Sequence, residues 1–264
     1  MPLQEFPAMM KLRRPPQAVL IDLAGVLHTG DLALPGAVDA LKRLRRSGLP
    51  LRFLTNTTRS PSATVIAKLR RMGFDLHPGE VQTAVLATRR LVAMRGLKPH
   101  YLVHPDIAGE IGPSNPNPDC VVLGDAGAYF SYAALNTVFR LLMQGLPLLA
   151  MARNRYFMEE DGLSLDMGAY VAGLEYSTGT QAEIVGKPAR PFFETALADL
   201  GVAAEDAVLI GDDLADDIGG AQEAGIPGIL VRTGKFRPED ERHATIRPDR
   251  VVDDFAAAVA ALSV

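Results

Sequence analysis

Residues Ala18–His28 read AVLIDLAGVLH and have the most informative pattern for the fold of this chain. Its first four residues are apolar and form the pattern of a buried strand. The strand ends in a single carboxylate, Asp22, and Gly25 follows as a turn residue. A helix is expected next, over residues 35–46. The segment therefore predicts a strand, a turn and a helix, with an acidic side chain at the carboxyl end of the strand.

The composition is that of a globular protein with a substantial core. The chain has 264 residues, of which 48% are hydrophobic and 22% charged, enough for one large domain or two smaller ones. The net charge of -4 argues against a nucleic-acid partner. No segment reaches the roughly 18 apolar residues of a membrane span, so we expect no membrane partner. The single cysteine, Cys120, lies in an apolar run; we expect a buried thiol and a cytoplasmic protein.

Short apolar runs alternate with amphipathic segments along the whole chain. This alternation is typical of α/β proteins, in which helices cover a parallel sheet. Ser60 as a cap and Pro61 at the first position mark the start of one helix, and Gly73 follows its end. Further elements of the two terminal thirds are expected as strands over 51–54, 207–210 and 228–231 and a helix over 217–224.

The middle of the chain carries elements of its own, enough for a second α/β domain inserted in the first. A proline-rich segment, 113–118, is expected to be a surface loop inside it. We therefore expect a core domain formed by residues 1–78 and 183–264 and an inserted domain formed by residues 79–182. The elements expected in the insert are helices over 83–95 and 132–144 and strands over 101–103, 120–123 and 148–150.

Polar side chains gather at the carboxyl ends of the expected core strands. Asp22 ends the first strand, and Thr55 with Asn56 ends the second. Asp212 ends a third strand, and Asp217 follows about one helical turn later. In an open parallel sheet, ligands bind in the crevice beyond these ends. Because carboxylate oxygens suit a hard cation, the pattern predicts a Mg²⁺ site.

The same edge has groups that would hold a phosphate. Lys187 supplies a positive charge, and Thr55 and Asn56 supply neutral donors. Asp22 is then a candidate nucleophile, because a carboxylate that attacks phosphorus forms an aspartyl phosphate and divides one difficult step into two. Each element alone is a weak signal, since a strand-terminal Asp more often belongs to a turn. The ordered set is a much stronger one.

The ordered set resembles the four motifs of the haloacid dehalogenase (HAD) superfamily of phosphohydrolases. The matching pieces are residues 22–26, residues 54–56, Lys187 and residues 211–217. The resemblance implies a Rossmann-like HAD core with a parallel sheet, a Mg²⁺ cofactor and a small phosphorylated substrate.

The resemblance also assigns roles to single residues. It implies that Asp22 is the nucleophile and that Thr55 and Lys187 hold the phosphoryl group. The metal ligands that it implies are Asp22, the backbone carbonyl of Ala24, Asp212 and, in a supporting position, Asp217.

The place of the insertion indicates the type of cap domain. The interval between Asp22 and Thr55 is too short for a domain, whereas the interval from Thr55 to Lys187 holds one. The cap thus lies between the second and third motifs, as in the C2-capped branch that includes p-nitrophenyl phosphatase-like enzymes. The resemblance further implies a homodimer through the cap. It also implies a loop that reads the leaving group, with Asn154 and Arg155 as candidates; an ordinary surface loop is the alternative.

Ala24 departs from the superfamily pattern. Most members have Asp at this place, which protonates the leaving group and later activates water. Such assistance is worth roughly 10²- to 10⁴-fold in rate. We therefore expect slow turnover and poor hydrolysis of alkyl phosphates, with smaller losses for pyrophosphate, acyl phosphates and phosphoramidates. The alternative is that Ala24 is a laboratory substitution in a parent protein with Ser or Asp at this position; the expected consequence for turnover is the same.

The sequence predicts a Mg²⁺-dependent phosphohydrolase with an aspartyl-phosphate intermediate, weakened by Ala24, that acts on a small phosphate, pyrophosphate or phosphorus–nitrogen substrate. The alternative from a different class is a catalytically silent module that binds a phosphometabolite or a protein. Phosphonate cleavage also occurs in members with Ala at this place. Their cap, however, lies between the first two motifs, where this chain has only Lys42.

Overall fold

The computed structural model of the chain describes residues 14–159, 162–242 and 245–262. Helices and strands alternate along these residues, so the predicted α/β class is confirmed. Contacts divide the chain into two compact units. The first takes in Met1–Leu54, Lys68–Val81 and Phe193–Val264, and the second takes in Thr55–Ala67 and Gln82–Phe192.

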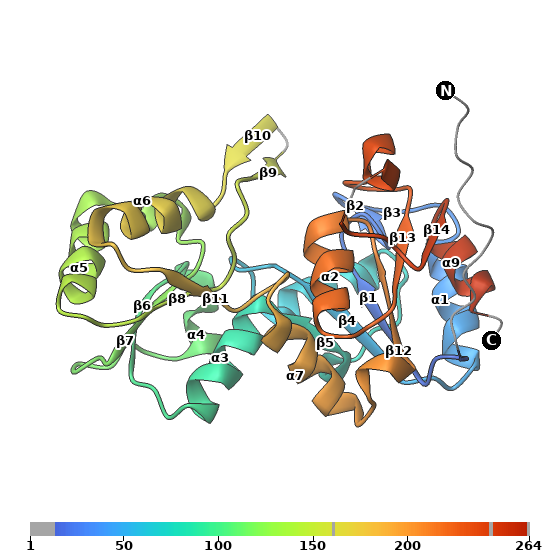
Figure 1. Cartoon of the computed structure of the whole chain (residues 1–264), viewed down its shortest axis with the longest axis horizontal. Helices are drawn as coiled ribbons and strands as arrows, with labels where there is room; N and C mark the ends of the chain where they lie inside the picture. Colours follow the sequence, from blue (N-terminus) through green and yellow to red (C-terminus); the bar gives the residue numbers. More distant parts are fainter. Residues whose placement is uncertain (1–13, 160–161, 243–244, 263–264) are drawn as a thin grey trace. The chain divides into compact units, whose positions relative to one another are not determined.

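The first unit is built around a six-stranded sheet with the order β14-β13-β12-β1-β4-β5. Its central strands β12, β1 and β4 are buried along their whole length, and their pairings are parallel (Figure 1). Such an all-apolar run is expected of a strand covered on both faces. The strands are β1 (Ala18–Asp22), β4 (Leu51–Thr55), β5 (Val81–Thr83), β12 (Ala207–Gly211), β13 (Gly228–Val231) and β14 (Arg250–Val252). The strands predicted over 51–54, 207–210 and 228–231 are thus confirmed.

Helices and one hairpin complete this part of the fold. Helix α1 turns Ala40, Leu41 and Leu44 into the core and its basic residues outward, and it packs against α9 (Figure 1). The helices are α1 (Ala37–Arg46), α8 (Gly220–Glu223) and α9 (Phe255–Ala261), and the hairpin strands are β2 (His28–Thr29) and β3 (Leu32–Ala33). Two more helices, α2 (Ser62–Arg71) and α7 (Arg190–Leu200), belong to this unit from Lys68 and from Phe193 onward.

Helix α1 is confirmed but begins at Ala37 rather than at residue 35, and two further helix starts differ from the sequence prediction. The helix expected over 217–224 begins earlier, as a π-helical segment at Leu214–Gly219 that continues into α8. The reason is Asp213, whose side chain accepts from the N–H groups of residues 215 and 216 and so caps the segment. Helix α2 begins at Ser62, whereas the sequence predicted Ser60 as the cap and Pro61 as the first helical residue. The N–H of Ser62 donates to the carboxylate of Glu110, a residue distant in the sequence.

The second unit has a four-stranded parallel sheet with the order β11-β8-β7-β6. Helices α5 and α6 pack side by side (Figure 1). Thr83 caps α3 by accepting from the N–H of Leu86. The sheet strands are β6 (Pro99–Leu102), β7 (Cys120–Leu123), β8 (Leu148–Ala150) and β11 (Ala182–Ile184), the hairpin strands are β9 (Tyr156–Glu159) and β10 (Gly162–Leu165), and the helices are α3 (Ala84–Met94), α4 (Ala108–Ile111), α5 (Tyr132–Met143) and α6 (Gly168–Thr178).

The elements predicted in the insert are confirmed, and the proline-rich segment 113–118 lies outside helices and strands. The sequence prediction missed β11 and the β9–β10 hairpin. The domain bounds 1–78 with 183–264 and 79–182 stay a prediction. The second unit also includes residues 55–67, which an ion pair between Arg59 and Asp125 ties to β7.

Candidate active site

Three buried carboxylates meet at the carboxyl end of the first unit's sheet. Oxygens of Asp22, Asp212 and Asp217 lie within 4.8 Å of one another, and the three residues are only 5%, 2% and 0% exposed. Asp22 is the last residue of β1, and Asp212 directly follows β12. Because Ile21 pairs with Ile210 in these neighbouring strands, the two carboxylates emerge from the same edge.

Glycines make the space that these carboxylates occupy. A Cβ atom at Gly25 or at Gly234 would overlap Oδ2 of Asp212, and a Cβ atom at Gly211 would overlap the side chain of Asp217. Gly25 has a φ of 87° and Gly234 a φ of 60°, in the left-handed region that favours glycine. The role of Gly234 was not predicted from the sequence, because no motif joins it to the acidic residues.

Backbone N–H groups orient two of the carboxylates. Oδ2 of Asp217 accepts from the N–H groups of Asp212 and Asp213, each at 3.2 Å. Oδ2 of Asp212 accepts from the N–H of Lys235 at 2.7 Å. These bonds fix the carboxylates and leave each with further lone pairs.

The cluster fits a hard divalent cation. Its donors are all oxygens, as Mg²⁺ prefers, and three buried carboxylates this close repel one another unless a cation lies between them. Asp213 has a different role, because one of its oxygens caps the following helix and the other pairs with Lys235 at 3.0 Å. Asp213 thus acts as a helix cap and as the partner of Lys235.

Ala24 lies in the turn that follows β1. Ala24 is exposed, and its backbone forms an isolated β-bridge with His28 at the start of β2. Nearby the carbonyl of Gly25 accepts a short hydrogen bond from Thr233 Oγ1. The methyl group of Ala24 has neither a donor nor an acceptor, so position 24 offers the substrate only its backbone.

A second group of predicted residues, Thr55, Asn56 and Lys187, lies in the second unit. Thr55 ends β4, one residue after the partner of Asp22 in the sheet register. Its Oγ1 atom lies 2.9 Å from Oγ1 of Thr57 and accepts from the Thr57 N–H at 3.3 Å. Lys187 is 5% exposed, and its backbone N–H and carbonyl are both bonded to the side chain of Asn56.

The remaining predicted residues, Asn154 and Arg155, follow β8 in the same unit. Asn154 is half-buried and Arg155 is exposed. Their backbone carbonyls accept from the N–H groups of Gly168 and Asp166, at 3.0 and 3.2 Å. These bonds fix the loop to the start of α6, whereas the roles of both side chains stay predictions.

Arg59 and Asp125 form a pair that was not predicted from the sequence. Nε of Arg59 lies 2.6 Å from the carboxylate of Asp125, which is 7% exposed, and the guanidinium lies 4.9 Å from the centre of the Phe157 ring. Arg59 follows Thr55 closely, but nothing local in the sequence connects it with β7 or with the β9–β10 hairpin. The pair links the segment after β4 to both of these elements.

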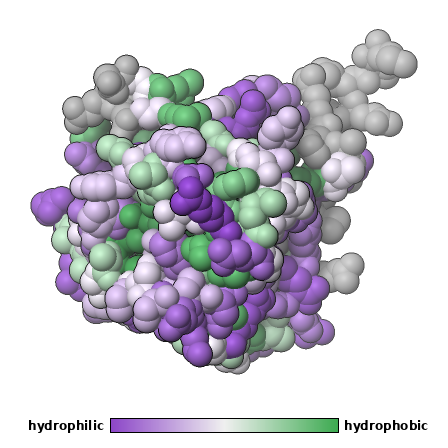
Figure 2. Space-filling view, turned by 90° about the vertical axis from the view of Figure 1, so that its left-hand side faces the viewer, coloured by the Kyte–Doolittle hydropathy of each residue, from purple (hydrophilic) through white to green (hydrophobic). Residues whose placement is uncertain are grey.

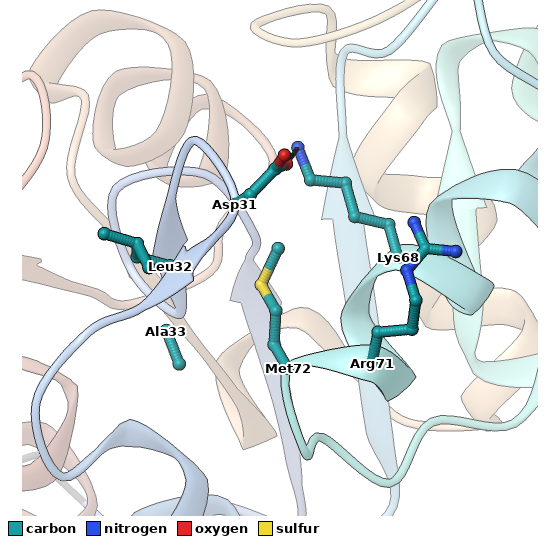
Figure 3. A pocket seen from close by; sticks show the side chains of 6 residues that line it. All are labelled: Asp31, Leu32, Ala33, Lys68, Arg71 and Met72. Carbon is teal, nitrogen blue, oxygen red and sulfur yellow. Dashed lines mark ion pairs between the residues drawn. The ribbon is translucent and has the colours of Figure 1, made fainter.

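A pocket of about 320 Å³ lies elsewhere in the first unit, between the β2–β3 hairpin and α2. Figure 3 shows Lys68 reaching Asp31 across it, with their charged atoms 2.8 Å apart. The lining of the pocket contains none of the predicted site residues. The ion pair neutralises the charges of Lys68 and Asp31 within this lining. The lining residues are Asp31, Leu32, Ala33, Lys68, Arg71 and Met72. The pocket is thus separate from the acidic cluster.

Comparison with known proteins identifies the family. Residues 19–111 match the model described as haloacid dehalogenase-like hydrolase, and residues 184–258 match the model described as HAD-hydrolase-like. Phospholysine phosphohistidine inorganic pyrophosphate phosphatase from Bos taurus is 45% identical over 252 residues, or 92% of this chain and 93% of that protein. The chain belongs to the haloacid dehalogenase-like hydrolase family. This membership of the HAD family confirms the resemblance seen in the motifs.

Further relatives support the HAD assignment. Haloacid dehalogenase-like hydrolase domain-containing protein 2 from Bos taurus is 45% identical over 254 residues, or 95% of this chain and 97% of that protein. The structure of 4-nitrophenylphosphatase from Thermotoga maritima has a TM-score of 0.88 at 28% identity and covers 94% of this chain and 98% of its own. The structure of glycerol phosphate phosphatase from Mycobacterium tuberculosis, in complex with magnesium, has a TM-score of 0.84 at 27% identity. The match covers 96% of this chain and 78% of that protein's chain.

These comparisons confirm the predicted Rossmann-like HAD core with a C2-type cap. At the level of the family, they also confirm the prediction of a HAD-like phosphatase. In the described part of the chain, no helix is long and apolar enough to cross a membrane.

Proposed function

We propose that this HAD-family hydrolase is a Mg²⁺-dependent phosphohydrolase that forms an aspartyl phosphate on Asp22. The observation that carries the proposal is the buried cluster of Asp22, Asp212 and Asp217 at the carboxyl end of a parallel sheet. Asp212 and Asp217, with Asp22 and the carbonyl of Ala24, would hold the Mg²⁺ ion. When bound, Mg²⁺ supplies positive charge that offsets the carboxylates and the phosphate.

In the first step a carboxylate oxygen of Asp22 attacks phosphorus. The bond from phosphorus to the leaving group breaks, and the leaving group departs with the electron pair. Lys187 and Thr55 hold the phosphoryl oxygens by charge and by hydrogen bonding. In the second step water attacks the phosphorus of the aspartyl phosphate, which releases inorganic phosphate and restores Asp22.

Ala24 narrows the range of substrates that we propose. A leaving group that receives no proton from residue 24 must be stable as it departs, or must be protonated by water. Pyrophosphate, acyl phosphates and phosphorus–nitrogen compounds meet this condition better than alkyl phosphates do. The name of the Bos taurus relative, which mentions phospholysine, phosphohistidine and pyrophosphate, supports the same classes. Asn154 and Arg155 are the side chains that we propose to read the leaving group.

The experiment measures phosphate release from pyrophosphate, phosphohistidine and p-nitrophenyl phosphate with Mg²⁺ and with EDTA. We expect release by the wild type only with Mg²⁺, and loss of release in Asp22→Asn. Asp39→Asn is the matched control, because Asp39 is exposed and pairs with nearby Lys42 on the same helix. Equal background release by wild type and Asp22→Asn would contradict the proposal.

A catalytically silent module that binds a phosphometabolite or a protein is the second candidate. Ala24 favours it, because the residue removes the proton donor and leaves the acidic cluster in place. Under this alternative the wild type binds inorganic phosphate with Mg²⁺ but releases none from the three substrates. The same assay, joined to calorimetry with inorganic phosphate, therefore separates the two candidates.

We also propose a homodimer through the second unit. Large apolar side chains are exposed on its helices: Tyr132 is 84% exposed and Met143 59% on α5, and Tyr176 is 93% exposed on α6. Figure 2 shows the side on which these helices are drawn, where hydrophobic patches lie among hydrophilic residues. Light scattering on the wild type and on Tyr176→Glu tests the proposal. A monomeric wild type would contradict it.

The cytoplasmic location expected from the single cysteine stays a prediction.

A further inference from the structure

The side-chain amide of Asn56 is paired with the backbone of Lys187. Its Nδ2 group donates to the carbonyl oxygen of Lys187 at 2.9 Å, and its Oδ1 atom accepts from the N–H of Lys187 at 2.8 Å. One amide thus satisfies both backbone polar groups of Lys187, as a neighbouring strand would. The two residues are 131 positions apart in the sequence.

Gly186 makes this close approach possible. A Cβ atom at position 186 would lie 2.7 Å from Oδ1 of Asn56 and would overlap the carbonyl oxygen of Met151. The N–H of Gly186 also donates to that carbonyl at 2.9 Å. The backbone before Lys187 is therefore fixed to the end of β8, and the backbone of Lys187 itself is fixed by Asn56.

The position of a lysine ammonium depends strongly on where its backbone is held, because four flexible methylene groups join the two. Binding groups lose effectiveness when they are displaced by even about 1 Å. Lys187 is 5% exposed, so a shift of its backbone would have to move a packed side chain. A fixed backbone is thus the means by which the fold orients this cation.

We infer that Asn56 is a positioning residue that acts through Lys187. This inference rests on the proposed function, in which Lys187 holds the phosphoryl group, and it replaces the direct substrate contact first expected of Asn56. Because Asn56 follows Thr55 directly, the amide also connects the two phosphate-holding residues, Thr55 and Lys187, through one short piece of chain. The main effect of Asn56 on the substrate is therefore exerted by the ammonium group of Lys187.

A double-mutant cycle tests the inference. We expect Lys187→Ala to lower kcat/KM for pyrophosphate on the order of 100-fold and Asn56→Ala to lower it about 10-fold. Because Asn56 acts through Lys187, the double variant should differ from Lys187→Ala by less than about 2-fold. Asn136→Ala, on α5, is the matched control and should leave kcat/KM unchanged. A double variant that loses the product of the two single effects would overturn the inference.

A second measurement does not depend on turnover. Hydrogen exchange of the Lys187 amide, followed by NMR, should be at least about 10-fold faster in Asn56→Ala than in the wild type, because its acceptor is gone. Unchanged exchange would overturn the inference. A wild type that releases no phosphate from any substrate would instead contradict the proposed function, and the exchange rates would then decide alone whether Asn56 holds Lys187.

Discussion

The carboxylate of Asp212 lies against the backbone of Gly234, so closely that a Cβ atom at position 234 would overlap its Oδ2 atom. The next residue, Lys235, donates its N–H to the same oxygen at 2.7 Å. The loop after β13 thus both makes room for Asp212 and orients it. The metal chemistry that we propose depends on this loop as much as on the acidic motif.

Gly234→Ala should therefore displace Asp212 and weaken Mg²⁺ binding. We expect Mg²⁺-dependent phosphate release to fall by more than about 10-fold, since a shift near 1 Å at a catalytic group has this effect or a larger one. Magnesium titration by calorimetry and kcat measure the change. Gly201→Ala is the control, because Gly201 has a similar φ of 67° and nothing within 4 Å of the added atom. Equal Mg²⁺ affinity in both variants would contradict the prediction.

Ala24→Asp should restore a proton donor at the exposed position after β1. We expect a rate gain of roughly 10²-fold or more for alkyl phosphates and a smaller gain for p-nitrophenyl phosphate, whose leaving group needs no proton. Initial rates with the two substrates at several pH values measure the difference. Ala24→Asn, which cannot donate a proton as an acid, is the control. No gain on alkyl phosphates would contradict the idea that Ala24 limits protonation.

Glu175→Gln should destabilise the second unit. The Glu175 carboxylate, 7% exposed, accepts from Arg153 at 3.1 and 2.6 Å and from the N–H of Ala182 at 3.0 Å. A glutamine amide would turn its NH₂ group toward one of these donors, so a hydrogen bond of the buried side chain would be lost. We expect the free energy of unfolding to fall by about 2 kcal/mol. Urea denaturation measures it.

A second Arg–Glu pair is the control for this change. Arg95 and Glu183 make two hydrogen bonds of 2.7 Å, but both side chains are 42% exposed. Solvent weakens such a pair, so Glu183→Gln should change the free energy of unfolding by less than about 1 kcal/mol. Equal losses in the two variants would show that burial of the carboxylate has no influence.

The thiol of Cys120 should be unreactive in the folded protein. Cys120 is buried in β7, and burial, with the nearby carboxylate of Asp119, raises the pKa of its thiol to about 11. The reactive thiolate is therefore scarce up to about pH 9. Titration with a thiol reagent at pH 8 should label the denatured chain fully and the native chain slowly. Rapid labelling of the native protein would contradict the burial.

The strands of both sheets were largely predictable from the sequence, because an apolar run and its turn residues are local signals. The strands β5, β11 and β14, each three residues long, and the β9–β10 hairpin were missed. Strands this short give no recognisable pattern, and the hairpin exposes apolar residues such as Leu163 and Leu165, so it does not show the burial pattern of a strand. The start of α2 was also missed, because it is fixed by Glu110, a partner that no local capping pattern contains.

The α/β class, the HAD motifs and the acidic residues Asp22, Asp212 and Asp217 follow from local sequence, since each is read from a few neighbouring positions. The bonds between Asn56 and Lys187 and the contact between Gly234 and Asp212 are visible only in the folded chain. Each pair joins a side chain to the backbone of a residue distant in the sequence, and every residue possesses such backbone atoms. Such pairs cannot be predicted from a pattern of side chains in the sequence. They form only where the fold brings the two residues within contact or hydrogen-bonding distance.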